Sequence, residues 1–291
     1  GGQRYPTVKD AINNRVLKGA LVINYTGHGG EVGWAHERVL EVSDINSWTN
    51  IENLPAFVTA TCEFSRFEDP ARTSAGELVL LNPNGGGIAL FTTTRLVYSA
   101  PNFTLNKNFY KHLFPVFGEP IPTMGEVMRK TVNEGSYGVI QNSRNFSLLG
   151  DPAQRLAYPV NNVVTTSVNG NPVGGNADTL KALGLVTVTG EIHDREGNKM
   201  TNFNGLIYPT VFDKAATVKT LGNDPGSPII EFKLQKNILY KGKASVTNGD
   251  FTFTFIVPKD ISYNYGYGRI SYYAFDGTTD ANGYYENVVI G

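Results

Sequence analysis

The chain has 291 residues, with 25 lysines and arginines against 26 aspartates and glutamates; 41% of its residues are hydrophobic and 18% are charged. This length predicts about two domains. The even charge balance excludes a basic nucleic-acid footprint, so no nucleic acid is expected as a partner. The hydrophobic content excludes a disordered chain, and the longest apolar runs fall far short of the roughly 20 residues that cross a bilayer.

Cys62 is the only cysteine of the chain. A disulfide within the chain and a thiolate-based zinc site are therefore both excluded. His112 and His193 have no second histidine or cysteine three or four residues away, so neither indicates a metal site. No cofactor is predicted, and the sequence leaves open whether calcium supports either domain.

Residues 1–158 alternate between helical and strand patterns. A helix is expected from Thr7, as its N-cap, to Gly19. Short apolar runs bounded by turn residues are typical of buried parallel strands. Three such runs occur, at Ala20–Asn24, Ala56–Ala60 and Gly87–Phe91.

Two more helices are expected in this half. One covers Phe103–Phe117, and the other follows a capping-box pair formed by Thr123 and Glu126. The alternation of helices and strands predicts an α/β domain over residues 1–158.

Residues 159–291 change to short β-rich segments separated by Gly, Asn and Asp. Asn248-Gly249, followed by alternating Phe251, Phe253 and Phe255, predicts a β-hairpin. Further strands are expected at Leu185–Ile192, Leu206–Phe212, Ile229–Leu234 and Arg269–Phe275. About seven strands in about 130 residues predict an all-β, immunoglobulin-like sandwich.

Two of the apolar strands are followed by residues capable of catalysis, His28 and Cys62. The carboxyl ends of parallel strands meet at one edge of a sheet, where ligands bind. An imidazole can activate a thiol and later protonate a leaving amine, so His28 and Cys62 suit a catalytic dyad. The structural alternatives are a small buried cysteine and a histidine that is merely part of a loop.

Several neighbours of this pair are candidates for supporting roles. The Gly29 and Cys62 amides could hold the oxyanion of a tetrahedral intermediate. Trp34 and Glu31 are candidate substrate-binding residues, although Trp34 could equally be an anchor that pins the loop. Glu31, His36 and Glu63 could each orient the imidazole, or could simply be solvated loop residues.

The segments 24–30 and 61–64, with Trp34 between them, resemble the gingipain family of cysteine peptidases, clan-mates of the caspases. The caspase Gln-Ala-Cys signature is absent. Further segments are similar to the gingipain-like sortases of the type IX secretion system in Bacteroidetes. They begin at Cys62, Thr73 and Asn145 in the first half, and at Val186, Tyr208 and Leu239 in the second.

This resemblance implies that Cys62 is the nucleophile, His28 the general acid and base, and the amides of Gly29 and Cys62 the oxyanion hole. It also implies that residues 1–158 are the C-terminal part of a gingipain-like peptidase domain and that residues 159–291 are the following β-sandwich. The implied reaction removes the C-terminal signal domain of secreted cargo through a thioester. The cargo then passes to an amine of anionic lipopolysaccharide at the cell surface, with a PorV-like outer-membrane barrel as partner.

The chain starts about one helix before the His28 strand, so we expect earlier strands of the sheet, and an acid that orients His28, to lie upstream of it. Two other functions stay open. A gingipain-type secreted endopeptidase would resolve the same thioester with water, and a non-catalytic surface module would use the fold only for binding. A pocket for a basic side chain needs an acid that the sequence does not reveal, which argues mildly against cleavage beside Arg or Lys.

Overall fold

The computed structural model describes residues 4–114, 118–134, 141–175, 178–223, 226–262 and 264–291. The chain divides into two compact units, Gly1–Tyr158 and Pro159–Gly291. Within the described part of the chain, no helix is long and apolar enough to cross a membrane.

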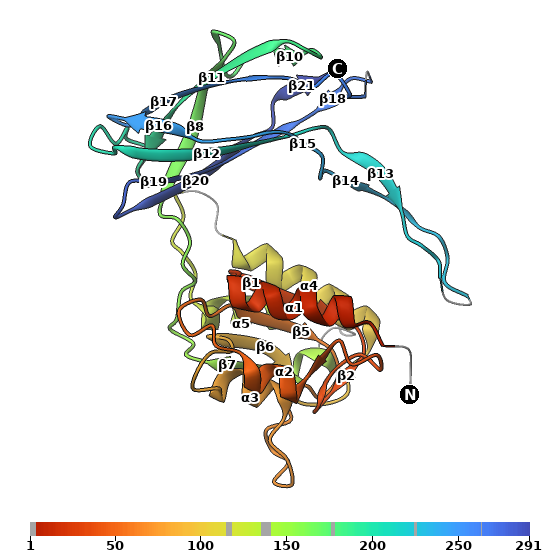
Figure 1. Cartoon of the computed structure of the whole chain (residues 1–291). Coiled ribbons are helices and arrows are strands. Elements are labelled where there is room, and N and C mark those ends of the chain that lie inside the picture. The colour runs from red at the N-terminus through yellow and green to blue at the C-terminus, as the bar shows by residue number, and fades with distance from the viewer. Residues whose placement is uncertain (1–3, 115–117, 135–140, 176–177, 224–225, 263) are drawn as a thin grey trace. The chain divides into compact units, whose positions relative to one another are not determined.

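The first unit is built on a four-stranded sheet with the order β1-β5-β6-β7 (Figure 1). Strands β1, β5 and β6 are parallel, and β7 is antiparallel to β6. The elements, in chain order, are α1 (Pro6–Lys18), β1 (Val22–Thr26), β2 (Gly29–Gly30), β3 (Gly33–Trp34), β4 (Leu40–Glu41), α2 (Val42–Ser47), β5 (Ala56–Ala60), α3 (Ala75–Leu81), β6 (Ala89–Thr93), α4 (Ser99–Leu113), α5 (Met124–Asn133) and β7 (Phe146–Gly150).

Helices cover both faces of this sheet because alternate residues of its strands point to opposite sides. Phe57 of β5 and Leu90 of β6 belong to the core cluster that includes residues of α1, α2 and α3. Val58 and Phe91, the next residue along each strand, belong to the cluster that includes residues of α4 and α5. The predicted α/β class is confirmed, and both central strands are fully buried.

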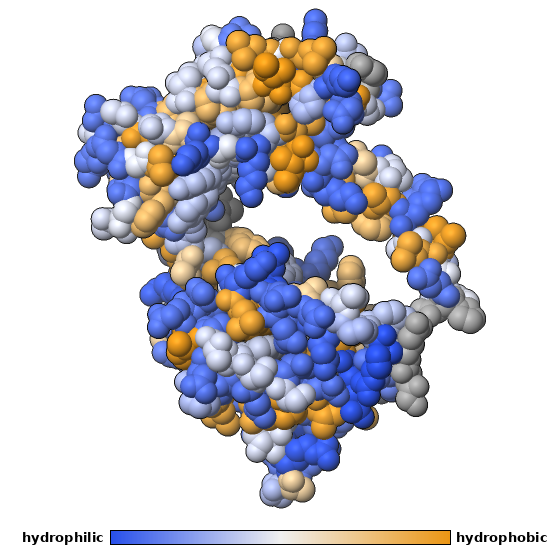
Figure 2. All heavy atoms as spheres, in the orientation of Figure 1, coloured by the Kyte–Doolittle hydropathy of each residue, from blue (hydrophilic) through white to orange (hydrophobic). Residues whose placement is uncertain are grey.

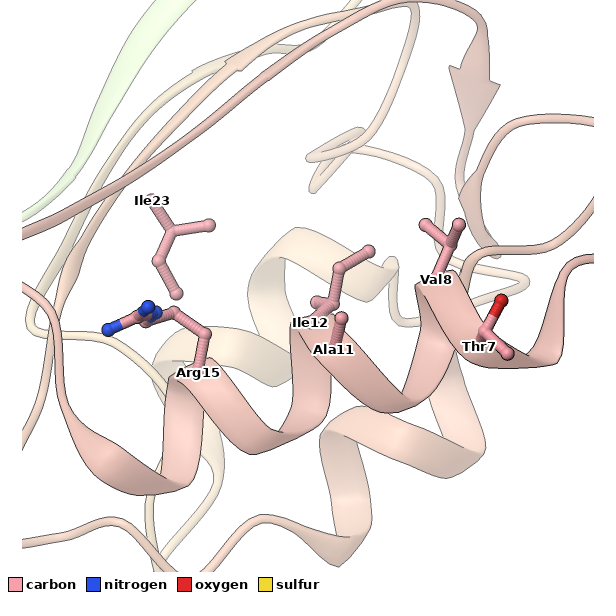
Figure 3. Close-up of a pocket in the computed structure, with 6 residues that line it drawn as sticks. All are labelled: Thr7, Val8, Ala11, Ile12, Arg15 and Ile23. Atoms are coloured by element: carbon pink, nitrogen blue, oxygen red, sulfur yellow. The ribbon is translucent and has the colours of Figure 1, made fainter. Parts of the chain in front are cut away.

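Helix α1 begins at Pro6, with Tyr5 as its N-cap, so the prediction that Thr7 caps the helix is wrong. Proline suits the first helical position because its fixed φ matches the helix and its missing N–H would have no partner there. Val8, Ala11 and Ile12 of α1 and Ile23 of β1 line an open pocket of about 350 Å³ (Figure 3).

The other predicted elements of this unit differ from the structure mainly at their ends. Helix α4 starts at Ser99 rather than Phe103, because Pro101 lies in its first turn, where a missing N–H is tolerated. It ends at Leu113, and residues 115–117 of the predicted helix lie outside the described residues. The capping box of α5 is confirmed, since Thr123 and Glu126 each bond the other's backbone amide.

The second unit contains only strands as regular elements within its described residues. They are β8 (Asn161–Val168), β9 (Asn171–Pro172), β10 (Asp178–Leu180), β11 (Leu185–His193), β12 (Gly205–Phe212), β13 (Ala216–Lys219), β14 (Glu231–Leu234), β15 (Ile238–Lys241), β16 (Ala244–Thr247), β17 (Asp250–Ile256), β18 (Gly266–Tyr267), β19 (Arg269–Phe275), β20 (Asp280–Tyr285) and β21 (Val288–Ile290).

The main sheet of this unit closes on itself. Its strands follow the order β11-β17-β16-β12-β19-β20-β8, and β8 pairs with β11 again. The all-β class is therefore as predicted, whereas two separate facing sheets of an immunoglobulin-like sandwich are not confirmed. The ring encloses an apolar core that includes Val188, Ile207 and Ile270.

The predicted hairpin at Asn248-Gly249 is confirmed as the turn between β16 and β17. Both turn residues have positive φ, 53° and 79°, the conformation that a two-residue hairpin turn requires. Phe251, Phe253 and Phe255 alternate with exposed residues, as predicted, and all three are buried in the core.

Strands β13 and β14 form an arm that extends away from the rest of the second unit (Figure 1). Its register places Val218 opposite Phe232 on one face, and Lys219 opposite Glu231 on the other. Phe232 and Ile230 are 45% and 55% exposed, and hydrophobic atoms are visible along the arm in Figure 2. The arm is therefore an amphipathic ribbon with an uncovered apolar face.

Replacing Phe91 by alanine is expected to destabilise the first unit by about 3–5 kcal/mol. Its ring is fully buried and stacks on Phe109 and Phe146, with centroids 4.9 and 4.8 Å away. Guanidinium unfolding followed by tryptophan fluorescence measures this unit, because Trp34 and Trp48 are the only two tryptophans. The control Phe103→Ala removes a ring that is 68% exposed and should change the free energy of unfolding by less than about 0.5 kcal/mol. Equal losses of stability in Phe91→Ala and Phe103→Ala would contradict this packing.

Candidate active site

His28 and Cys62 lie at the same edge of the first unit's sheet. Strands β1 and β5 are parallel and in register, with Thr26 opposite Ala60. Each candidate residue follows the end of its strand by two positions. Both line one open hollow with a volume of about 1090 Å³, so the structure brings together the two residues that the sequence predicted to meet.

Gly29 lies close to Thr61, the residue before Cys62. A Cβ atom built on Gly29 would lie 2.5 Å from the hydroxyl oxygen of Thr61 and 3.0 Å from the carbonyl oxygen of Gly33. Thr61 is buried and immediately precedes Cys62. A side chain at position 29 would therefore push the His28 loop away from the end of β5.

The backbone at His28 is held by two donors. The Tyr25 hydroxyl donates to the His28 carbonyl at 2.6 Å, and the Ala35 amide donates to the same oxygen at 2.7 Å. Burial, and next the negative charge of Glu37, raise the pKa of Tyr25 above its usual value. The phenol therefore keeps the proton that it donates.

Trp34 is a buried anchor, and the prediction that it lines a substrate subsite is wrong. Its side chain is 1% exposed. Its ring stacks on Tyr25 with a centroid distance of 4.5 Å and an interplanar angle of 4°, and it also packs against Phe57 and Phe64. Trp34 thus ties the glycine-rich loop to the core beneath it.

The register of β2 and β3 sets the direction of the Gly29 amide. Gly29 pairs with Trp34, and the next pair along is His28 with Ala35. The Ala35 amide donates to the His28 carbonyl, so His28 and Ala35 form a hydrogen-bonded pair. In an antiparallel ladder, hydrogen-bonded pairs alternate with non-hydrogen-bonded pairs, so Gly29 and Trp34 form a non-hydrogen-bonded pair. The Gly29 N–H therefore points away from β3 and is not used by this ladder, as an oxyanion donor requires.

Cys62 is presented on a sharp turn after β5. The next residue, Glu63, has φ +49°, a left-handed conformation that non-glycine residues seldom adopt. The Glu63 amide donates to the Arg95 carbonyl at 3.3 Å, and the Ser65 amide donates to the Thr93 carbonyl at 2.9 Å. These bonds fix the turn against the end of β6.

Among the described residues, no hydrogen bond joins the Cys62 thiol to the His28 imidazole. The Cys62 thiol donates to the Val97 carbonyl, with Sγ 3.7 Å from the oxygen. The His28 ring lies beside the ring of His36, with centroids 5.9 Å apart. Catalytic hydrogen bonds of an empty site commonly tighten only when substrate binds, so this geometry is compatible with a dyad.

Neither predicted carboxylate orients His28. Glu31 pairs with Arg66 at 2.9 Å and with Arg72 at 3.4 Å, and Glu63 pairs with Arg66 at 3.7 Å. Of the three candidates only His36 contacts the His28 ring. The proposed substrate-binding role of Glu31 also lacks support, because its side chain is 15% exposed and already paired with arginines.

Sequence reasoning missed several residues that build this site. Local sequence could have indicated Thr61 and Tyr25, because Thr61 directly precedes Cys62 and Tyr25 lies in the strand that leads to His28. Arg38, Arg72 and Leu96 also line the hollow, and no local pattern marks them because the fold brings them in. Among the described residues, no cluster of three His, Cys, Asp or Glu could hold a metal ion.

A histidine and a cysteine at adjacent parallel strand ends, in an open hollow, define a cysteine-peptidase type of site. The sequence model of peptidase family C25 matches residues 1–157. The chain therefore belongs to peptidase family C25, a family of cysteine peptidases, and the resemblance to gingipains expected from the residues is confirmed.

Solved structures with similarity to this chain include two from Porphyromonas gingivalis. Dimeric latent PorU is 30% identical, with 72% of this chain and 20% of that chain covered and a TM-score of 0.42. The complex of RgpB pro- and mature domains is 16% identical, with 97% of this chain and 58% of that chain covered and a TM-score of 0.45. The chain thus spans a fifth of the PorU chain. No curated protein matches it.

Gly29→Ala is expected to lower the stability of the first unit by about 1–3 kcal/mol, because the new methyl group overlaps Thr61. The neighbouring Gly30 is the matched control, since a Cβ there meets no atom within 4 Å. Gly30→Ala should stay within about 1 kcal/mol of the wild type. Guanidinium unfolding read by tryptophan fluorescence compares them, and partial recovery in Gly29→Ala/Thr61→Ala would locate the overlap. Equal stability of the two single variants would contradict the close approach.

Proposed function

We propose that this chain carries the nucleophile and the acid-base residue of a cysteine transpeptidase, a sortase. The observation that carries this proposal is the convergence of His28 and Cys62 on one hollow. Membership of family C25 supports cysteine chemistry at this site. Cys62 would attack the scissile carbonyl while His28 accepts the thiol proton.

The first half of the reaction would end in a thioester. The Gly29 and Cys62 amides would stabilise the oxyanion of the tetrahedral intermediate. His28 would then give its proton to the leaving amine, so that the C–N bond breaks while the C–S bond remains. In the second half, an amine would attack the thioester, His28 would accept a proton from that amine, and Cys62 would leave as the thiolate.

The substrate and acceptor are proposed from the sortase-like segments that begin at Cys62 and Asn145. The donor would be a secreted protein with a C-terminal signal domain, and the acceptor an amine of anionic lipopolysaccharide. The reaction would take place at the extracellular face of the outer membrane, beside a PorV-like barrel protein. Of the two solved structures described above, PorU has the higher sequence identity to this chain, 30%.

A peptide electrophile should form a covalent adduct at Cys62, and His28→Ala should slow its formation at least tenfold. Mass spectrometry of the intact chain reads the adduct without ambiguity because Cys62 is the only cysteine. His193→Ala, in the second unit, is the control and should label at the wild-type rate. Absence of any adduct in the folded wild-type protein would reject the catalytic proposal and favour a binding module.

Transfer and hydrolysis are separated by the fate of a peptide thioester formed on Cys62. With a simple amine such as glycinamide present, a sortase gives mainly the amide, and the yield rises with amine concentration. An endopeptidase gives mainly the free acid at every amine concentration. The second result would replace the sortase by a gingipain-type hydrolase without changing the roles of His28 and Cys62.

A further inference from the structure

The hollow beside Cys62 is lined by more cationic than anionic side chains. Three arginines contribute to its lining, Arg4, Arg38 and Arg72, together with the imidazoles of His28 and His36. Among the described residues that line it, Glu41 is the single carboxylate. Even with both histidines neutral, cationic groups outnumber carboxylates on this surface.

Glu41 is already neutralised by its neighbours. Its carboxylate lies 2.7 Å from the Lys9 ammonium, 3.0 Å from the Arg38 guanidinium and 3.9 Å from that of Arg4. The hydrogen bond from Lys9 is the largest cause that lowers the pKa of Glu41 below its usual value. Glu41 is therefore ionised and paired, and it offers little to a basic group of a ligand.

A second carboxylate of the first unit, Glu31, is also paired with arginines. Glu31 pairs with both Arg66 and Arg72, and it does not belong to the lining of the hollow. Arg72 has one hydrogen bond to this carboxylate, at 3.4 Å, and a guanidinium has five N–H donors. The Arg72 guanidinium therefore has donors beyond this bond, and Arg72 lines the hollow.

Arg38 and Arg72 are two exposed arginines of this lining. Their side chains are 58% and 55% exposed, and both line the hollow that contains the thiol. Guanidinium groups bind carboxylates through two parallel hydrogen bonds. A lysine or arginine of a substrate would instead meet like charges, and no unpaired carboxylate among the described residues that line the hollow.

We propose that the hollow selects acyl-donor peptides that carry an acidic side chain close to the scissile bond, and that Arg72 and Arg38 recognise this carboxylate. The proposal rests on the proposed function, because it treats the hollow as the place where the donor peptide binds. It assigns to the chain a specificity opposite to cleavage beside Arg or Lys.

The test compares peptide electrophiles that differ in one residue, placed next to the electrophile in one series and one position further away in another. That residue is Glu, its neutral isostere Gln, or Lys. At 50 mM salt the Glu probe of at least one series should label Cys62 about tenfold faster than its Gln counterpart, and the Lys probe should be the slowest. The Glu-to-Gln ratio should fall towards 1 at 500 mM salt, because screening weakens the ion pair.

Charge variants locate the recognition. In Arg72→Gln and Arg38→Gln the Glu-to-Gln ratio should fall at least threefold, and Arg72→Glu should bring the Lys probe ahead of the Glu probe. Arg129→Gln, an exposed arginine of α5, is the matched control and should keep the wild-type ratio. Equal labelling by Glu, Gln and Lys probes would overturn the proposal while leaving the catalytic dyad intact.

A binding measurement separates this proposal from the proposed function. Fluorescein-labelled Glu, Gln and Lys peptides without an electrophile are titrated into Cys62→Ala protein, and anisotropy gives the affinities. Salt-sensitive preference for the Glu peptide, even if the wild type forms no adduct, supports the anionic subsite and rejects only the catalysis. Failure of the Glu peptide to bind more tightly than the Gln peptide overturns the subsite, whatever the labelling experiment shows.

Discussion

The close approach of Gly29 to Thr61 is the constraint on which the site depends. It lets the loop after β1 lie directly against the end of β5, and a single methyl group at position 29 would occupy space held by the threonine hydroxyl. The stack of Trp34 on Tyr25 and the two hydrogen bonds to the His28 carbonyl also hold that loop in place. His28 and Cys62 reach the same hollow because the backbone beneath them is fixed at both points.

Much of the first unit was predictable because its signals are local. Strand β5 has the predicted bounds Ala56–Ala60, and the capping box of Thr123 and Glu126 marks the start of α5. The pairing of β7 with β6 was not predictable, because antiparallel closure of a parallel sheet leaves no local pattern. That His28 and Cys62 line one hollow was predictable from their two strand ends. Trp34 was ambiguous, because a tryptophan among glycines suits a subsite as well as an anchor, and only its neighbours decide between them.

In the second unit, alternation of apolar and polar residues identified strands but not their partners. Phe251, Phe253 and Phe255 show which face is buried, and Asn248-Gly249 shows where the chain turns. Closure of the sheet depends on the pairing of β8 with both β11 and β20, and β20 is far from β8 in sequence, with Ala281 opposite Asn161. A similar limit applied to the hollow. Arg38 reaches it from the turn between β3 and β4, and Arg72 reaches it from ten residues after Cys62 in the loop between β5 and α3.

The account centres on the claim that His28 activates Cys62, and the rate at which iodoacetamide alkylates the folded chain at pH 7 tests it most directly. Every adduct reports on one sulfur, because the chain has a single cysteine. A neighbouring imidazole raises the thiolate fraction, so the wild type should react at least about tenfold faster than His28→Ala. Equal rates in the two proteins, with their folds intact, would show that the imidazole and the thiol do not act together and would contradict the account.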